Sequence, residues 1–245
     1  MAVQTVTQQV ETSPQLYARL AGAAYLLIII AGLCGELFIR GKIIVSGDAA
    51  ATAHNLMASD GLWRAGIAGD LMMHLCDILV MLVFFLLLRA VNRTLALMAL
   101  LFNLIQTAVL VANKITLLVP LFFLSDAAYL KAFNVQQLQA LAYVSIKTHD
   151  YGFGIGLIFF GFTCLLNGYL IRKSGFLPKL IGILMQIAGV CYLVNSLALI
   201  LDLSFASRLF PFIMLPPFVA ELTFSLWLLI KGIDVAKWQE KTRSW

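Results

Sequence analysis

Three titratable side chains interrupt one apolar stretch of the sequence. Asp70, His74 and Asp77 occur within the run GDLMMHLCDILV, whose other residues are almost all apolar. Spacings of four and three residues place them on one face of a helix, because a helix turns about 100° per residue. A charged side chain at the centre of a bilayer costs about 2.5–3.5 kcal/mol, so such residues usually have partners and a function. The stretch predicts a helix with one polar face.

Polar side chains also interrupt the other apolar stretches, at similar expected depths. If they face one another, Lys114 offsets the charge of the carboxylates, and together they line one polar cavity that opens to the outer face of a membrane. Pro216 and Pro217 free two backbone carbonyls, which favours the same interior. The ligand-binding residues that we predict for this cavity are Asp70, His74, Asp77, Lys114, Glu36, His149, Asp150, Asn195 and Glu221.

A first interpretation of the cavity is a metal centre or a site for a small polar ligand. Asp70, His74, Asp77 and His149 offer mixed nitrogen and oxygen ligands, which suit zinc or another divalent ion. Such an ion could activate water for hydrolysis of a lipid or envelope substrate. The sequence has no HExxH motif, however, and His74 is also explained by a structural polar contact. Neither a catalytic residue nor an enzymatic activity follows from these residues.

Two further interpretations stay open. In the first, the protein is a proton- or ion-coupled carrier of a small solute, and the carboxylates, His74 and Lys114 bind or relay charge. In the second, the protein has a structural or sensory role, and the buried ion pairs only fix the register of the helices.

The composition is that of a membrane protein. Of the 245 residues, 62% are hydrophobic and only 12% are charged, about half the charged fraction of a typical soluble domain. A helix needs about 20 apolar residues to cross a bilayer. The sequence thus predicts an all-α fold, a bundle of six transmembrane helices with short outer-face helices. The six stretches are approximately Leu20–Phe38, Ala65–Leu88, Leu95–Leu124, Gly152–Ile171, Leu180–Leu201 and Leu209–Ile230.

The expected domain organisation is simple. Residues 1–19 form a polar cytoplasmic tail, residues 20–232 the transmembrane domain, and residues 233–245 a basic cytoplasmic tail. Lys and Arg are more frequent on the side that holds both termini, which predicts that both lie in the cytoplasm. The net charge of +5 is attributed to this orientation and to contact with the lipid bilayer, not to a nucleic-acid partner. A homo-oligomer remains open.

Two longer connections contain helix signals. Ser46 or Asp48 can cap a short helix after the first stretch, and Asn134 with Gln137 forms the pattern of a capping box. Both helices are expected to lie on the outer surface. In the fourth stretch, Asp150 shares one helix face with a row of glycines that predicts close helix packing, namely Gly154, Gly161 and Gly168.

The chain resembles a known family over most of its length. The segments RLAGAAYLLIIIAGLCGELFIRGKIIVSGDAAATAHNLMASDGLWRAGIAGDLMMHLCDILV and HDYGFGIGLIFFGFTCLLNGYLIRKSGFLPKLIG are similar to a bacterial membrane family known as domain of unknown function 4386. The likeness extends from about Ala18 to Gly232. It implies a multi-span protein of the bacterial inner membrane, and it implies no activity and no catalytic residues.

Overall fold

The computed structural model describes residues 13–243, and these residues form helices joined by short connections. Six helical stretches are long and apolar enough to cross a membrane, which confirms the predicted all-α, six-helix architecture. The stretches begin and end close to the predicted positions, with one large exception in the fourth. They are Pro14–Ile43, Asp60–Leu88, Arg93–Phe123, Val135–Ser174, Lys179–Leu201 and Phe212–Ile230.

Two of the membrane-length stretches are not regular helices. The first consists of α1 (Pro14–Cys34), a π-helical turn η1 (Gly35–Arg40) and α2 (Gly41–Ile43). The third bends at Lys114, between α5 (Arg93–Asn113) and α6 (Ile115–Phe123). The remaining long helices are α4 (Asp60–Leu88), α7 (Val135–Ser174), α8 (Lys179–Leu201) and α10 (Leu215–Ile230), the last preceded by the 3-10 turn η3 (Phe212–Met214).

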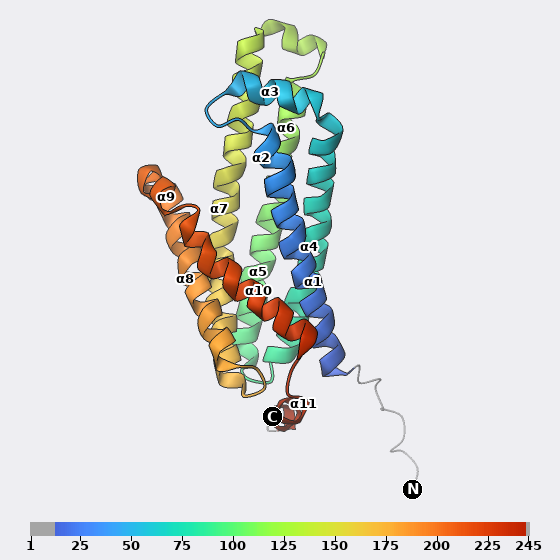
Figure 1. Ribbon diagram of the computed structural model, residues 1–245, viewed down its shortest axis with the longest axis vertical. Helices are drawn as coiled ribbons and strands as arrows, with labels where there is room; N and C mark the ends of the chain where they lie inside the picture. Colours follow the sequence, from blue (N-terminus) through green and yellow to red (C-terminus); the bar gives the residue numbers. More distant parts are fainter. Residues whose placement is uncertain (1–12, 244–245) are drawn as a thin grey trace.

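Helices α1, α4, α5 and α7 run along the long axis of the molecule, α10 crosses obliquely, and short elements lie at the two ends (Figure 1). Helix α3 (Ala49–Ala58) crosses one end, which we call the α3 end. The start of α1 and helix α11 (Val235–Arg243) lie at the opposite end, the α11 end. Helix α9 (Leu203–Leu209) follows α8 well short of the α3 end, and the 3-10 turn η2 (Ala128–Ala132) precedes α7.

Both predicted helix caps are present. The side chain of Asp48 accepts a hydrogen bond from the backbone N–H of Ala51 at the start of α3. Asn134 and Gln137 form the predicted capping box at the start of α7. We had expected the helix that begins there to end before the fourth apolar stretch. It instead continues through that stretch and is 40 residues long. Its C-cap is Gly175, whose φ of +76° is a left-handed conformation that favours glycine.

The glycine row of α7 packs against α8, as the sequence predicts. A Cβ atom on Gly168 would lie 2.6 Å from the backbone oxygen of Gly182, and one on Gly161 would lie 3.0 Å from that of Gly189. The first distance is shorter than real Cβ contacts and the second is tighter than most of them, so glycine at these positions lets the two backbones approach. Asp150 does not join this contact, because its carboxylate pairs with Lys147 at 3.2 Å on the surface.

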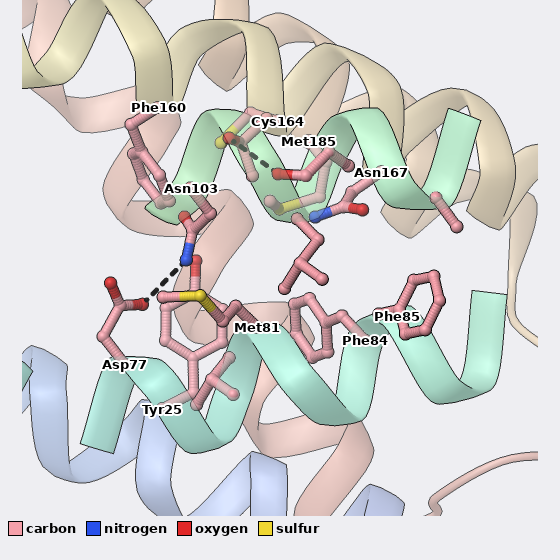
Figure 2. Close-up of a pocket in the computed structure, with 15 residues that line it drawn as sticks. Tyr25, Asp77, Met81, Phe84, Phe85, Asn103, Phe160, Cys164, Asn167 and Met185 are labelled. Carbon is pink, nitrogen blue, oxygen red and sulfur yellow. Dashed lines mark hydrogen bonds between the residues drawn. The ribbon is translucent and has the colours of Figure 1, made fainter. Parts of the chain in front are cut away.

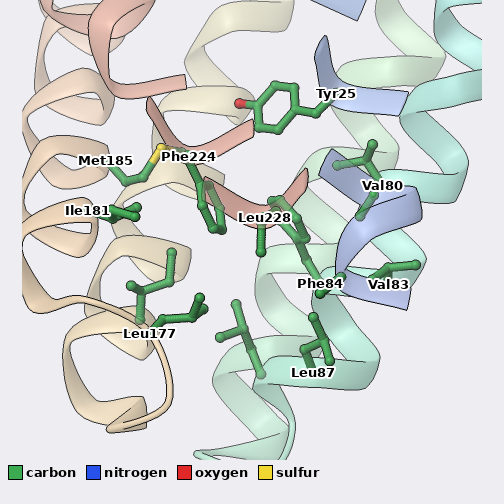
Figure 3. Close-up of a cluster of buried hydrophobic side chains, with 14 of the residues drawn as sticks. Tyr25, Val80, Val83, Phe84, Leu87, Leu177, Ile181, Met185, Phe224 and Leu228 are labelled. Carbon is green, nitrogen blue, oxygen red and sulfur yellow. The ribbon is translucent and has the colours of Figure 1, made fainter. Parts of the chain in front are cut away.

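An aromatic core joins α1, α4 and α10 in the half of the bundle near the α11 end (Figure 3). The ring centroids of Phe84 and Phe224 are 4.9 Å apart, and the ring of Tyr25 contacts both edge-on. Trp238 of α11 donates a hydrogen bond to the backbone oxygen of Leu87, at 3.1 Å. These contacts fix the helices that carry the polar residues described next.

Candidate functional site

Four side chains from four membrane-length stretches meet in an ion-pair cluster. The Oδ2 atom of Asp70 accepts hydrogen bonds from Nζ of Lys114 at 2.8 Å and from Nη1 of Arg40 at 2.9 Å. Nζ of Lys114 also lies 3.4 Å from Nε2 of His149. The side chains of Asp70 and Lys114 are only 3% and 7% exposed. Two cations thus share one buried carboxylate. Arg40 also pairs with a second carboxylate, that of Glu36, at 2.8 Å and at a more exposed position.

The π-helical turn places Arg40 in this cluster. In η1 the backbone N–H of Gly41 bonds to the oxygen of Glu36, five residues earlier instead of four. This register turns the side chain of Arg40 toward α4, and π turns of this kind are frequent at functional sites. Gly35 leaves room for the pair, because a Cβ there would lie 3.1 Å from Nη2 of Arg40 and 3.5 Å from Oδ1 of Asp70.

The bend at Lys114 is supported by contacts with α7. Pro120 has no N–H to bond to the oxygen of Thr116, four residues earlier. That oxygen instead accepts a hydrogen bond from the hydroxyl of Ser145 on α7, at 2.7 Å. Next to Lys114, the amide of Asn113 donates to the backbone oxygen of His149, at 2.9 Å. Helices α5, α6 and α7 are therefore held together on both sides of the Lys114 ammonium group.

Apolar side chains close the cluster on the side of the α3 end. They form a small core with Trp63 at its centre, which donates a hydrogen bond from Nε1 to the oxygen of Leu117 at 2.8 Å. Between Arg40, Trp63 and Leu117 the structure leaves no room for a water molecule. The predicted convergence on Asp70 is thus found as a packed cluster of ion pairs. The members of the small core are Ile43, Leu56, Trp63, Ile67, Leu117 and Ile146.

Asp77 has different partners and lies beside a cavity (Figure 2). Its Oδ1 atom accepts a hydrogen bond from the amide of Asn103 at 3.3 Å, and its Oδ2 atom accepts one from the hydroxyl of Thr107. The cavity has a volume of about 30 Å³, and Asp77, Asn103, Thr163 and Asn167 supply its main polar groups. We call it the Asp77 cavity. A volume of this size holds one or two water molecules.

His74 lies on α4 between the two polar groups. It is 4% exposed, and its Nε2 atom is buried without a hydrogen-bond partner. A buried polar atom without a partner is uncommon and indicates strain, a bound species or a function. His74 therefore stays a candidate functional residue.

The other predicted residues do not join the ion-pair cluster directly. Glu221 accepts a hydrogen bond from the hydroxyl of Tyr192. Asn195 is buried on α8 and does not line the Asp77 cavity. Asp150 is on the surface, with half of its side chain exposed. Several of the predicted residues are buried, and the structure divides them into separate groups.

The predicted metal ligands are not grouped in the structure. Within residues 13–243, no three His, Cys, Asp or Glu side chains are arranged to hold a metal ion. Asp70 and Asp77 are seven residues apart on one helix, which corresponds to about 10 Å along its axis. Lys114 and Arg40 bind the first carboxylate, whereas Asn103 and Thr107 bind the second. The four residues Asp70, His74, Asp77 and His149 therefore do not surround one point.

Three partners were not predicted from the sequence. Arg40 follows the first apolar stretch and has the pattern of a residue that flanks a membrane helix, although Glu36 four residues earlier is a signal for an ion pair. Thr107 lies four residues after Asn103 and so shares its helix face, which could have identified it. Nothing in the sequence around Tyr192 indicates its contact with Glu221.

Comparisons with known proteins bear on the family and not on the chemistry. Neither curated proteins nor solved structures gave a match to this chain. One family model matches residues 20–232, and its description is "Domain of unknown function (DUF4386)". This range is most of the chain and contains every residue of the ion-pair cluster and of the Asp77 cavity. The chain belongs to the DUF4386 family.

Proposed function

We propose that this chain is a proton-coupled membrane protein of the carrier type. The observation that carries the proposal is the row of Asp70, His74 and Asp77 on one face of α4, with different partners for each carboxylate. Rows of Asp, Glu and His within membrane helices are typical of proton relays in pumps and transporters. Separate partners make the two carboxylates separate proton-binding sites at different levels of the bundle.

In this relay, His74 transfers protons between the carboxylates of Asp70 and Asp77. Spacings of four and three residues correspond to about 6 Å and 4.5 Å along the helix axis. Proton transfer needs hydrogen-bond contact, either directly or through one water molecule. The Nε2 atom of His74 has no other partner, so it is free to make such a contact. An imidazole binds a proton at one nitrogen and releases one from the other, which suits a relay.

The ion-pair cluster couples proton uptake to the helices. Protonation of Asp70 removes its negative charge and weakens its bonds to Arg40 on the first stretch and Lys114 on the third. The helices that carry these cations then lose a shared contact with α4 and can shift against it. Two arrangements of packed helices, selected by one proton, are what a coupled carrier needs.

The packing around the cluster favours this function over hydrolysis of a lipid or envelope substrate. A substrate and its attacking water need space beside the reactive groups. The space at Arg40 and Trp63 does not admit a water molecule, and apolar side chains cover it toward the α3 end.

We also propose a location in the bacterial inner membrane, with both termini in the cytoplasm. The start of α1 and helix α11 lie at the same end of the bundle as two short connections (Figure 1). Arg89 lies in the connection between α4 and α5, and Arg172, Lys173 and Lys179 flank the connection between α7 and α8. Lys and Arg favour the cytoplasmic side. Protease access to α11 in inverted vesicles, but not in intact cells, is the expected result. The opposite pattern would reverse the orientation.

Proton flux in liposomes tests the function. The purified chain is reconstituted with a pH-sensitive dye inside the vesicles, and a potassium gradient with valinomycin drives proton entry. We expect flux above that of protein-free vesicles, and at least about a tenfold loss in Asp77→Asn, because a relay without one proton-binding site is interrupted. Asp60→Asn is the matched control on the same helix, since the Asp60 side chain is exposed and its ion pair within residues 13–243 is with Arg64. Equal flux in the two variants would overturn the proposal.

A further inference from the structure

The Asp77 cavity contains one carboxyl group and no Lys, Arg or His among the described residues that line it. Asn103 and Thr107 both donate hydrogen bonds to the carboxyl oxygens of Asp77. The basic side chains of the ion-pair cluster, Arg40 and Lys114, are bound to Asp70 instead. An ionised carboxylate without a basic partner within a membrane helix is costly unless a cation compensates it.

A second, independent observation indicates a ligand in the cavity. Asn103 is 4% exposed and lines the cavity, and its Oδ1 atom is buried without a hydrogen-bond partner. Its amide nitrogen donates to Asp77 (Figure 2), so its oxygen is left as a buried acceptor without a donor. A buried acceptor is usually satisfied by a donor, by water or by a cation. The carboxamide that binds Asp77 therefore has an unsatisfied oxygen next to the cavity that Asn103 lines.

The polar groups around this space are oxygen ligands. Asn167 is 6% exposed and contributes a carboxamide (Figure 2). The hydroxyl of Thr163 donates its proton to the backbone oxygen of Phe159, at 3.1 Å, which leaves its lone pairs available. Carboxylate, carboxamide and hydroxyl oxygens are ligands for hard cations such as alkali and alkaline-earth ions. The volume of about 30 Å³ accommodates one ion with at most one water molecule.

The charge of the site selects the valence of the ion. Asp77 is the only carboxylate among the described residues that line the cavity, and the lining outside its polar groups and the ring of Tyr25 consists mainly of apolar side chains such as Phe84 and Met185. One positive charge neutralises it, whereas a divalent ion leaves an excess charge in an apolar surrounding. We propose that the Asp77 cavity binds one monovalent cation, Na⁺, between Asp77, Asn103, Thr163 and Asn167.

The role of this ion rests on the proposed function, because it makes Na⁺ an alternative to H⁺ at Asp77. Binding of Na⁺ keeps the carboxylate ionised and blocks its protonation, so the two cations compete for one site. Carriers of other folds also bind their coupling ions near the middle of the membrane. Binding of the ion itself is a separate property and can be measured without any transport.

Equilibrium binding of radioactive ²²Na⁺ to the purified full chain tests the proposal. The ionic strength is kept constant with choline chloride, whose cation is too large for the cavity. We expect one Na⁺ per chain, displaced by unlabelled Na⁺, and no binding in Asp77→Asn. Asn103→Ala and Asn167→Ala should each raise the Kd about 10–100-fold, as expected when one hydrogen-bonding or ligating group to a charge is removed. Asp60→Asn, at an exposed ion pair of the same helix, should bind as the unmodified chain does.

Size-exclusion profiles and thermal unfolding without Na⁺ show that each variant is folded before binding is compared. Absence of Na⁺ binding in the folded, unmodified chain overturns the proposal, and so does an unchanged Kd in both asparagine variants. If proton flux depends on Asp77 while Na⁺ does not bind, the cation site is wrong and the proton-coupled function stands. If Na⁺ binds while no proton flux is measured, the cation site stands and the proton-coupled function is wrong.

Discussion

Replacement of Asp70 by asparagine is the strongest single perturbation of the ion-pair cluster. The change removes one negative charge and leaves Arg40 and Lys114 beside each other without their shared carboxylate, with side chains only 14% and 7% exposed. Loss of one partner from a buried ion pair costs about 3–5 kcal/mol, because the remaining charge stays buried without compensation. We expect Asp70→Asn to lower the free energy of unfolding by that amount.

The second variant, Lys114→Met, should be milder. Asp70 keeps its bond to Arg40 at 2.9 Å, and methionine fills a volume similar to that of the lysine stem. We expect a loss of about 1–3 kcal/mol, the cost of leaving one hydrogen-bonding group unsatisfied. The double variant should be more stable than Asp70→Asn alone, because it no longer contains the uncompensated ammonium group. The two changes are therefore expected to be non-additive.

Equilibrium unfolding in mixed micelles with increasing SDS, followed by tryptophan fluorescence, measures these energies. The control is Asp60→Asn, which breaks a pair with Arg64 whose side chains are 47% and 58% exposed. An exposed pair contributes at most about 1 kcal/mol. A loss of stability in Asp70→Asn no larger than that in Asp60→Asn would refute a stabilising role of the buried cluster. Strict additivity of the two cluster variants would also refute that role, since it would show that Asp70 and Lys114 do not interact.

Three further predictions concern packing and capping. Gly168→Ala should separate α7 from α8 and lower the midpoint of thermal unfolding, because the new Cβ would lie 2.6 Å from backbone atoms. The control Gly69→Ala, whose new Cβ has no atom within 4 Å, should leave the midpoint unchanged or raise it. Tyr192→Phe removes one of two tyrosine hydroxyl partners of the buried Glu221, the other being Tyr25, and should cost about 1–3 kcal/mol in the same SDS titration. Asn134→Ala removes the capping box and about 1 kcal/mol of local stability, which should appear as faster hydrogen exchange in the first turn of α7 while the rest of α7 is unchanged.

The elements predicted correctly are those that depend on local signals. Apolar length identifies the six stretches, because a bilayer core requires it wherever the rest of the chain lies. Asp48 and Asn134 cap their helices through bonds to backbone groups three residues away, so a short window of sequence contains the whole interaction. The glycine row of α7 is likewise visible as spacing, and Gly182 and Gly189 on α8 supply the close contacts it requires.

Where prediction failed, depth or backbone register decided the outcome. Asp70 and Asp77 share a helix face, but a shared face says only toward which neighbouring helix the side chains point, not at which depth in the bundle they lie. Their partners Lys114 and Thr107 are seven residues apart on the facing stretch. Arg40 was missed because a π-helical turn shifts the helix phase, and no pattern in the sequence signals that turn. The helix that begins at Asn134 and the fourth apolar stretch were predicted as separate elements, but the chain continues through the polar residues Thr148, His149 and Asp150 as the single helix α7.

The length of α7 has a mechanical consequence. Gly154 contacts Leu199 near the end of α8, so α7 continues for nineteen residues, about 28 Å, beyond its neighbour. Helix α7 is unbroken over about 60 Å, so it can tilt as one rod about its glycine contact with α8, and the nineteen residues before Gly154 carry His149. A tilt of about 5° moves the start of α7 by roughly 2.5 Å, which is of the order of the distance that makes or breaks a hydrogen bond. A small rearrangement at the Lys114–His149 contact therefore becomes a larger displacement at the start of α7, the part on which α3 packs.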